Sequence, residues 1–206
     1  RPNGDVKKTT NFKDGKAIET RTFRKGKTTS INNETRLDVE KHGDILTMEK
    51  IGESHQGRPL MMIKISDNPQ SDELEPEVKY IANMHGDEIV GRELMVLLIA
   101  DLAKKYKEGD EEIKDLIDNT EIFIMPSMNP DGAAAQRRAN GQWVDLNRDF
   151  PDFSTRDDLN TPNGRGPETK AVMNWQKKRN ISLSANFHGG AEVVNYPWDT
   201  IADAHP

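Results

Sequence analysis

The chain has 206 residues, a length typical of one domain or of one domain with an appendage, and only 33% of its residues are hydrophobic. Its formal net charge is −6 with both signs interspersed, and the lack of a dense basic stripe argues against a nucleic-acid partner. Cysteine is absent, which excludes disulfides, and without an apolar run of about 18 residues we expect no membrane span. The sequence starts at Arg1 and shows no signal-peptide core, which is compatible with a secreted or periplasmic protein whose leader has been removed, or with a trimmed sequence.

Residues 1–36 are polar and charged, and we predict that they form an N-terminal extension outside the main domain. Alternating residues at 17–23 suggest small hairpins in this segment. A flexible or peripheral leader and an ordered extension both agree with the pattern. The main domain is predicted to cover residues 37–206, because strand-like and helix-like segments alternate from about Leu37 onward.

The main domain shows two kinds of apolar segment. Short segments of strand length predict strands at residues 46–52, 59–65, 78–83, 121–125 and 181–187. Longer segments predict helices at residues 88–106, 110–117 and 167–179, and the dense apolar run within the first helix predicts burial on most of its sides. Strands that alternate with helices predict an α/β fold with a mixed, largely parallel twisted sheet flanked by helices.

A candidate metal site lies at the corner where the strand 78–83 gives way to a helix. His85 and Glu88 lie three residues apart on this corner, and His188 follows the last predicted strand. Two imidazoles and one carboxylate hold zinc in hydrolases, and open α/β sheets bind ligands beyond the carboxyl ends of their strands. The alternative is a surface histidine beside a helix-terminal glutamate, since His42-Gly43-Asp44 repeats the same first three residues without a glutamate.

Two further loops carry polar residues in suggestive patterns. Asn129-Pro130-Asp131-Gly132 follows the strand 121–125 and is a turn signature. Asn147-Arg148 can bind a carboxylate, because the guanidinium group pairs with both oxygens and the amide adds a donor. The alternative for the second loop is an ordinary solvated, charged loop.

Six motifs, in this order within residues 40–206, resemble the zinc metallocarboxypeptidases, and within them the N-terminal two thirds of the carboxypeptidase N/E (regulatory) subfamily. They are HGDE at 85–88, NPDG at 129–132, RxN at 138–140, DLNRDFPD at 145–152, PET at 167–169 and HGGAEVVNYPWD at 188–199. The resemblance implies that residues 37–206 are the N-terminal portion of a zinc carboxypeptidase catalytic domain. It also implies one Zn²⁺ per site.

The resemblance assigns a role to each residue around the metal. His85, Glu88 and His188 would be the zinc ligands, and Asp145 would accept a hydrogen bond from the first histidine. Arg138 would polarise the scissile carbonyl and stabilise the developing oxyanion. These assignments describe a metal-dependent hydrolase of peptide bonds.

The resemblance also assigns the substrate contacts. Asn147 and Arg148 would bind the free C-terminal carboxylate of a peptide, which makes the enzyme an exopeptidase. Asp199 would lie in the pocket for the departing side chain and favour Arg or Lys there. Asp87 departs from the asparagine that regulatory members more often carry, which leaves the specificity open.

One part of the family pattern has no match in this sequence. The family's general base is a glutamate well downstream of the third zinc ligand, and no residue in 189–206 fits it, since Glu192 is too close to His188. We therefore expect a fold that is incomplete at its C-terminus, with a C-terminal fragment of the same protein as a possible partner.

The expected function is a zinc-dependent exopeptidase that releases a single C-terminal residue, Lys or Arg, from peptides with a free C-terminal carboxylate. The first alternative is a non-catalytic homologue that binds zinc or peptides without the general base. The second alternative is a related amidase that acts on cell-wall peptides.

Overall fold

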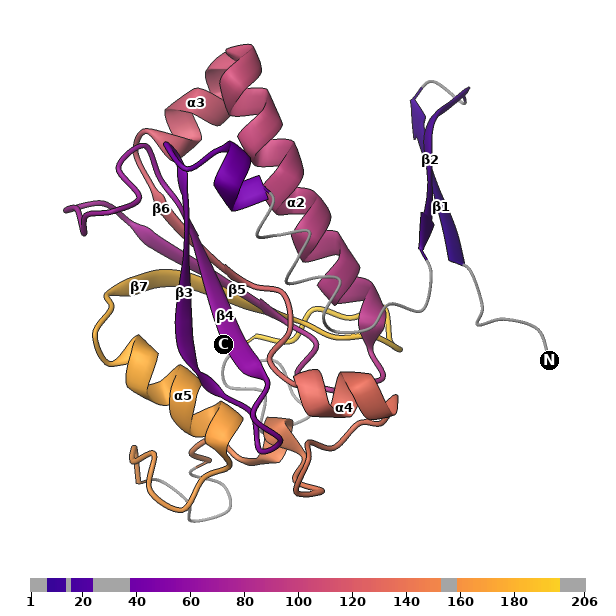
Figure 1. Ribbon diagram of the computed structural model, residues 1–206, viewed down its shortest axis with the longest axis vertical. Coiled ribbons are helices and arrows are strands. Elements are labelled where there is room, and N and C mark those ends of the chain that lie inside the picture. Colours follow the sequence, from indigo (N-terminus) through magenta and orange to yellow (C-terminus); the bar gives the residue numbers. More distant parts are fainter. Residues whose placement is uncertain (1–6, 14–15, 24–37, 153–158, 197–206) are drawn as a thin grey trace.

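The computed structural model describes residues 7–13, 16–23, 38–152 and 159–196. Near the N-terminus, β1 (Lys7–Lys13) and β2 (Lys16–Phe23) pair antiparallel and form a two-stranded sheet of their own (Figure 1). This pair is a hairpin of the kind predicted from the alternating residues. The proposed boundary between an extension and the main domain at residue 37 stays a prediction.

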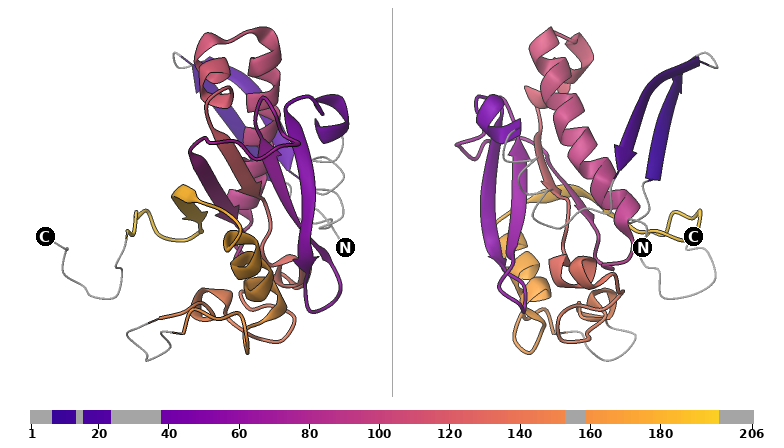
Figure 2. Two further views of the ribbon diagram at one scale, coloured as in Figure 1. Left: turned by 90° about the vertical axis from the view of Figure 1, so that its left-hand side faces the viewer. Right: turned by 45° about the vertical axis from the view of Figure 1, so that its right-hand side comes forward.

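The main sheet has five strands in the order β3-β4-β6-β5-β7 (Figures 1 and 2). Its antiparallel part pairs β3 with β4 and β4 with β6, and its parallel part pairs β6 with β5 and β5 with β7. The predicted mixed sheet is therefore confirmed. The strands are β3 (Leu46–Glu53), β4 (Pro59–Ile65), β5 (Glu77–Ala82), β6 (Glu121–Met125) and β7 (Ile181–Phe187).

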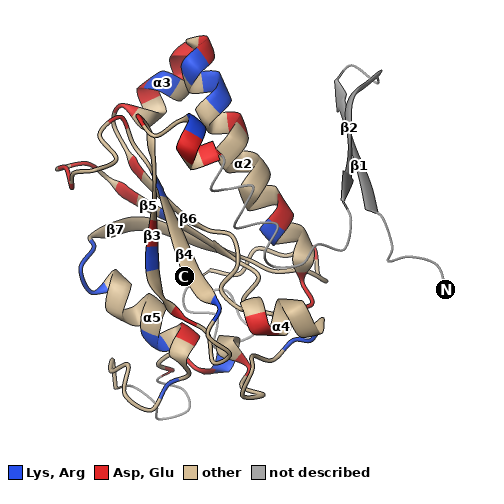
Figure 3. Cartoon of the chain, viewed as in Figure 1, with Lys and Arg blue, Asp and Glu red and all other residues tan. Residues whose placement is uncertain are grey.

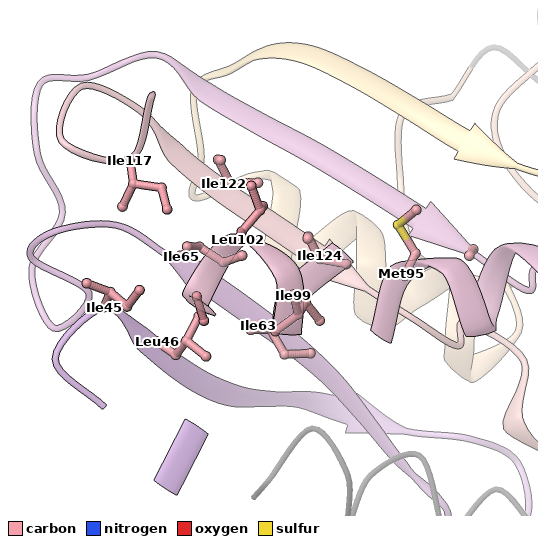
Figure 4. Packing of buried hydrophobic residues seen from close by; sticks show 12 residues of the cluster. Ile45, Leu46, Ile63, Ile65, Met95, Ile99, Leu102, Ile117, Ile122 and Ile124 are labelled. Carbon is pink, nitrogen blue, oxygen red and sulfur yellow. The ribbon is translucent and has the colours of Figure 1, made fainter. Parts of the chain in front are cut away.

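Each face of the sheet is covered by helix. On one face lies α2 (Ile89–Glu108), whose Met95 and Ile99 pack with the strands in the first core cluster, shown in Figure 4. On the other face lies α5 (Pro167–Gln176), whose Trp175 belongs to the second cluster. The short helix α3 (Glu111–Ile117) follows α2, and Asp110 caps it by accepting a hydrogen bond from the Ile113 amide.

Strand β6 contributes side chains to both hydrophobic clusters. All five of its residues are buried, because helices cover both faces of the sheet at this central position. Side chains alternate along a strand, so Ile122 and Ile124 join the cluster on the α2 face. Phe123 and Met125 join the cluster on the α5 face, where the Phe123 ring meets the Trp175 ring edge-on at 5.1 Å.

One expectation needs correction. The residues 129–132 do more than form a turn, because they begin the helix α4 (Pro130–Ala135), with the Asn129 side chain accepting a hydrogen bond from the Gly132 amide. Helix α2 is buried or partly buried on most of its sides, as expected, and a stripe that includes Val90, 54% exposed, and Leu94, 49% exposed, faces solvent. Within the described residues, no helix has the length and apolar character needed to cross a membrane.

Candidate metal centre

The corner between β5 and α2 is held in shape by the buried Asn83. This residue has a φ of 56°, a left-handed conformation that asparagine tolerates better than most residues. Its side-chain amide donates to the carbonyl oxygens of His85 at 2.8 Å, Gly86 at 3.2 Å and Glu88 at 3.2 Å. One side chain thus fixes the backbone that carries two candidate ligands, a role that the sequence analysis did not assign to it.

The backbone of the same corner packs closely against the start of helix α4. A Cβ atom on Gly86 would lie 2.0 Å from the carbonyl carbon of Gly132, so only glycine fits at this position. The Asn129 amide donates to the carbonyl oxygens of Met84 at 3.2 Å and Arg138 at 3.1 Å. The glycines of the HGDE and NPDG motifs therefore allow two backbones to meet.

The sheet brings the two candidate histidine ligands to one edge. Strands β5 and β7 are parallel neighbours, with Ala82 opposite Phe187 at their carboxyl ends. His85 follows the first strand by three residues, and His188 directly follows the second. The two imidazole centroids lie 4.8 Å apart.

Three side chains converge at this edge. The Nδ1 atom of His85 lies 2.8 Å from one carboxylate oxygen of Glu88, and the Nδ1 atom of His188 lies 2.9 Å from the other oxygen. The two Nδ1 atoms are 3.2 Å apart. His85 is almost fully buried, whereas His188 is one-third exposed, so the cluster is anchored on the protein side and open toward solvent.

The donor set and its spacing fit a zinc ion. Bonds of about 2.0–2.1 Å in a tetrahedron place neighbouring ligand atoms about 3.3 Å apart. The separations within the cluster are 2.8, 2.9 and 3.2 Å, close to that value. Two nitrogen donors and one carboxylate are also the ligand types that zinc takes in catalytic sites.

Asp145 orients the first histidine. One of its oxygens lies 3.0 Å from His85 Nε2, which fixes the proton on that nitrogen and leaves the Nδ1 lone pair facing the cluster. Its other oxygen accepts a hydrogen bond from Arg138 Nε at 2.9 Å. The burial of Asp145 raises its pKa, but the hydrogen bonds from Arg138, the Asn147 amide and His85 outweigh this effect, and the pKa lies below its ordinary value.

The pKa of Glu88 is set by two opposing effects, as that of Asp145 is. Burial of Glu88 raises the pKa, but the hydrogen bond from the Gly189 amide and the close contacts with the His85 and His188 rings outweigh this effect and hold the pKa below its ordinary value. The Nη1 atom of Arg138 lies 3.7 Å from a Glu88 oxygen and adds positive potential. Both carboxylates of the centre are therefore ionised at neutral pH.

Asn147 and Arg148 lie in a short 3₁₀ turn, Leu146–Arg148, directly after Asp145. The Asp145 side chain accepts a hydrogen bond from the Asn147 amide at 2.9 Å, and Leu146 is fully buried beneath the turn. The side chains of Asn147 and Arg148 are exposed. The structure thus places this pair beside the candidate metal ligands, joined to them through Asp145.

A buried pair of polar side chains supports the loop between Arg138 and Asp145. Glu168, fully buried at the start of α5, accepts hydrogen bonds from the Asn140 side chain at 2.8 Å and from the His55 amide at 3.1 Å. The Oδ1 atom of Asn140 accepts hydrogen bonds from the backbone amides of Gln142 and Val144, each at 2.9 Å. In the sequence, Glu168 stands out only as part of the PET motif, which assigns it no role of its own.

One assigned residue has no described position. Asp199, predicted to contact the departing side chain, lies outside the described residues. Among the described histidines, only His85 and His188 belong to the cluster, and His42 and His55 do not.

Comparisons with known proteins agree on one family. Residues 31–206 match the family model Peptidase_M14, described as zinc carboxypeptidase. Carboxypeptidase SOL1 of Arabidopsis thaliana is 48% identical over 161 residues, which cover 77% of this chain and 32% of that protein. The carboxypeptidase N catalytic chain of Mus musculus is 44% identical over 184 residues, which cover 76% of this chain and 40% of that protein. The chain thus spans 32–40% of the length of these relatives.

Solved structures show the same fold. Thrombin-activatable fibrinolysis inhibitor superposes with a TM-score of 0.68 at 18% identity, over 82% of this chain and 48% of that chain. A metallo-carboxypeptidase from Pseudomonas aeruginosa, in complex with (2-guanidinoethylmercapto)succinic acid, gives a TM-score of 0.60 at 26% identity, over 77% of this chain and 40% of that chain. The family match, the relatives and the fold lead to one conclusion: this chain belongs to the zinc carboxypeptidase family.

Proposed function

We propose that this chain forms the metal-binding and carboxylate-binding part of a zinc-dependent exopeptidase that releases a single C-terminal residue from peptides. The observation that carries the proposal is the convergence of two imidazole Nδ1 atoms on the Glu88 carboxylate at the ends of β5 and β7. The chain spans at most 40% of the length of the relatives described above, so turnover is proposed for the whole enzyme.

In this proposal His85, Glu88 and His188 hold one Zn²⁺, which would supply Lewis-acid polarisation of the scissile carbonyl and the attacking water. Asp145 keeps the His85 ring in the tautomer and orientation needed for binding through Nδ1. The support is the fit between the donor spacing and tetrahedral zinc, together with membership of the family.

Arg138 is proposed to stabilise the oxyanion that develops at the scissile carbonyl. Its Nε atom is held by Asp145, and its Nη1 atom lies 3.7 Å from a Glu88 oxygen, so the guanidinium group lies at the rim of the metal cluster. The side chain is 49% exposed, which leaves donors free to meet a substrate. A fixed cation beside a developing negative charge lowers the barrier without further rearrangement.

Asn147 and Arg148 are proposed to bind the C-terminal carboxylate of the peptide. Both side chains are exposed on a turn that Asp145 fixes next to His85. A main-chain carboxylate one residue from the scissile bond exists only at the C-terminus of a peptide. This pair would therefore restrict cleavage to the last residue. Asp199 is proposed as the acidic group that favours a basic side chain on the residue that is released.

A C-terminal Lys or Arg is the proposed substrate preference. The guanidino group in the ligand of the Pseudomonas aeruginosa structure is cationic, as the arginine side chain is. A secreted or periplasmic location, and residues 37–206 as the catalytic domain portion, belong to the same proposal.

A pair of peptides that differ only at the C-terminus tests this function in the full-length enzyme. We expect hydrolysis of a peptide that ends in Lys with a free carboxylate and none of its C-terminal amide. A panel that ends in Arg, Leu, Glu and meso-diaminopimelate separates a basic preference from the amidase alternative. Zinc binding without turnover of any member would instead favour the non-catalytic homologue.

A further inference from the structure

The loop that carries Arg138 is joined to the metal corner through its backbone. Arg138 comes shortly after the end of α4, among the basic residues that Figure 3 shows there in blue. Its carbonyl oxygen accepts two hydrogen bonds, one from the Gly86 amide at 3.3 Å and one from the Asn129 side-chain amide at 3.1 Å. Gly86 lies in the sequence between the proposed zinc ligands His85 and Glu88. The backbone of Arg138 is therefore placed relative to the segment that carries these ligands.

Asn129 is the side chain that makes this connection. It is fully buried, and both of its polar atoms are used. Its Nδ2 atom donates to the carbonyl oxygens of Arg138 at 3.1 Å and Met84 at 3.2 Å, and its Oδ1 atom accepts from the Gly132 amide at 2.8 Å. One buried side chain thus joins the end of β5, the start of α4 and the loop that carries Arg138.

The guanidinium group of Arg138 depends on this anchored backbone for its place beside the metal cluster. The side chain is 49% exposed, so few packing contacts restrain it. It is held at its tip by the hydrogen bond from Nε to Asp145 at 2.9 Å. The backbone hydrogen bonds from Gly86 and Asn129 hold the other end.

We propose that Asn129 is a positioning residue that fixes Arg138 for stabilisation of the oxyanion, an inference that rests on the function proposed above. A cation stabilises a developing negative charge best when it is already in place, and a displacement of about 1 Å can cost on the order of 100-fold in rate. The two donors of Asn129 carry the role rather than its bulk. A carboxylate of the same shape would leave two carbonyl oxygens without their donor.

Steady-state kinetics of the full-length enzyme on a peptide that ends in Lys test the proposal. Asn129→Asp keeps the size of the side chain and the oxygen that caps α4, but it loses both donors. We expect kcat to fall about 10–100-fold, with KM changed less than about threefold and one Zn²⁺ retained. In an Arg138→Ala background the same substitution should lower kcat by less than about threefold, because the residue that it positions is already removed. Asp110→Ala, which removes the cap of α3, is the control for a general loss of stability and should leave kcat unchanged.

Hydrogen exchange of the Gly86 amide, measured by NMR on the zinc-loaded full-length enzyme, gives a readout that does not require turnover. We expect this amide to exchange at least about tenfold faster in Asn129→Asp, because the carbonyl oxygen that it donates to loses its second donor. The amides of β4 should exchange as in the parent enzyme. Asn129→Ser keeps a capping oxygen but is too short to reach Arg138, so it should behave in the same way if Asn129→Asp does not fold.

Four results would overturn the proposal. These are a parental kcat in Asn129→Asp, an equally large loss in the Arg138→Ala background, unchanged exchange of the Gly86 amide, and a loss of zinc that accounts for the lower kcat. Absence of hydrolysis by the parent enzyme would instead contradict the proposed function. The exchange of the Gly86 amide would still show whether Asn129 holds the backbone of Arg138 in place.

Discussion

The two ends of the parallel strands β5 and β6 carry carboxylate clusters of opposite character. At the carboxyl end, Glu88 and Asp145 each accept several hydrogen bonds, and their pKa values lie below the ordinary range. At the amino end, Glu73, Glu75 and Glu121 each keep one oxygen without a donor in the described structure, and the pKa of Glu75 is raised. The first cluster is organised by the protein itself, whereas the second lacks compensating donors. The ligands proposed for zinc are therefore held in place by partnered side chains, whereas the carboxylates at the amino end repel one another.

The largest expected effect comes from disrupting the backbone at the carboxyl end of β5, where His85 and Glu88 lie. Gly86→Ala places a Cβ atom 2.0 Å from the Gly132 carbonyl carbon, so the corner that carries His85 and Glu88 must move. We expect a loss of about 3 kcal/mol or more in the free energy of unfolding, measured with urea, and a loss of zinc binding. Gly57→Ala is the control, because a Cβ there meets nothing within 4 Å and only the φ of 75° is strained. It should cost about 1–2 kcal/mol and retain zinc.

A moderate effect is expected from removing the charge that orients His85. Asp145→Asn keeps the size of the side chain but loses the ionised acceptor for His85 Nε2 and Arg138 Nε. Zinc affinity, measured by competition with a chelator, should fall about 10–100-fold. Asp149→Asn, four residues along the same loop and outside the cluster, serves as the control. An Asp145→Asn variant with parental zinc affinity would show that this residue does not orient the ligand.

The smallest expected effect comes from Glu75, near the amino ends of β5 and β6, and it depends on pH. Burial and neighbouring charges raise the pKa of Glu75 above 4.5 in the folded chain, so folding is favoured while this group is protonated. That contribution is present below about pH 4.5 and is lost as the pH rises through the folded-state pKa. Glu75→Gln should therefore stabilise the chain at pH 7, by less than about 1 kcal/mol, and have no effect at pH 4. Chemical unfolding at both pH values checks this, and destabilisation at pH 7 would contradict the repulsion.

The sequence predicts the strands and the edge at which the candidate ligands meet, because both depend on local patterns. Apolar runs bounded by polar residues mark β5, β6 and β7, and the alternation of strand and helix favours a parallel arrangement of these strands. That β5 and β7 are direct neighbours is seen only in the structure. His85 comes three residues after such a run, and His188 comes directly after one. The sequence therefore indicates that each histidine lies at the carboxyl end of a strand.

The supporting residues could not be predicted in the same way, because their roles depend on contacts between distant segments. Glu168 and Asn140 are 28 positions apart, and an acid in a first helical turn is usually exposed rather than buried. Glu73 and Glu121 are 48 positions apart, so nothing local to either shows the hydrogen bond between the Glu73 amide and the Glu121 carboxylate. Asn83 gave one usable signal, since an asparagine at the end of a strand often marks a left-handed residue.

Zinc titration of the metal-depleted chain tests the central claim most directly. We predict one Zn²⁺ per chain, and a loss of affinity of more than about 100-fold in His188→Ala, because one of three ligands is removed. His55→Ala, at an exposed histidine outside the cluster, should bind as the parent chain does. Equal zinc affinity of His188→Ala and the parent chain would contradict the assignment of His85, Glu88 and His188 as the metal centre.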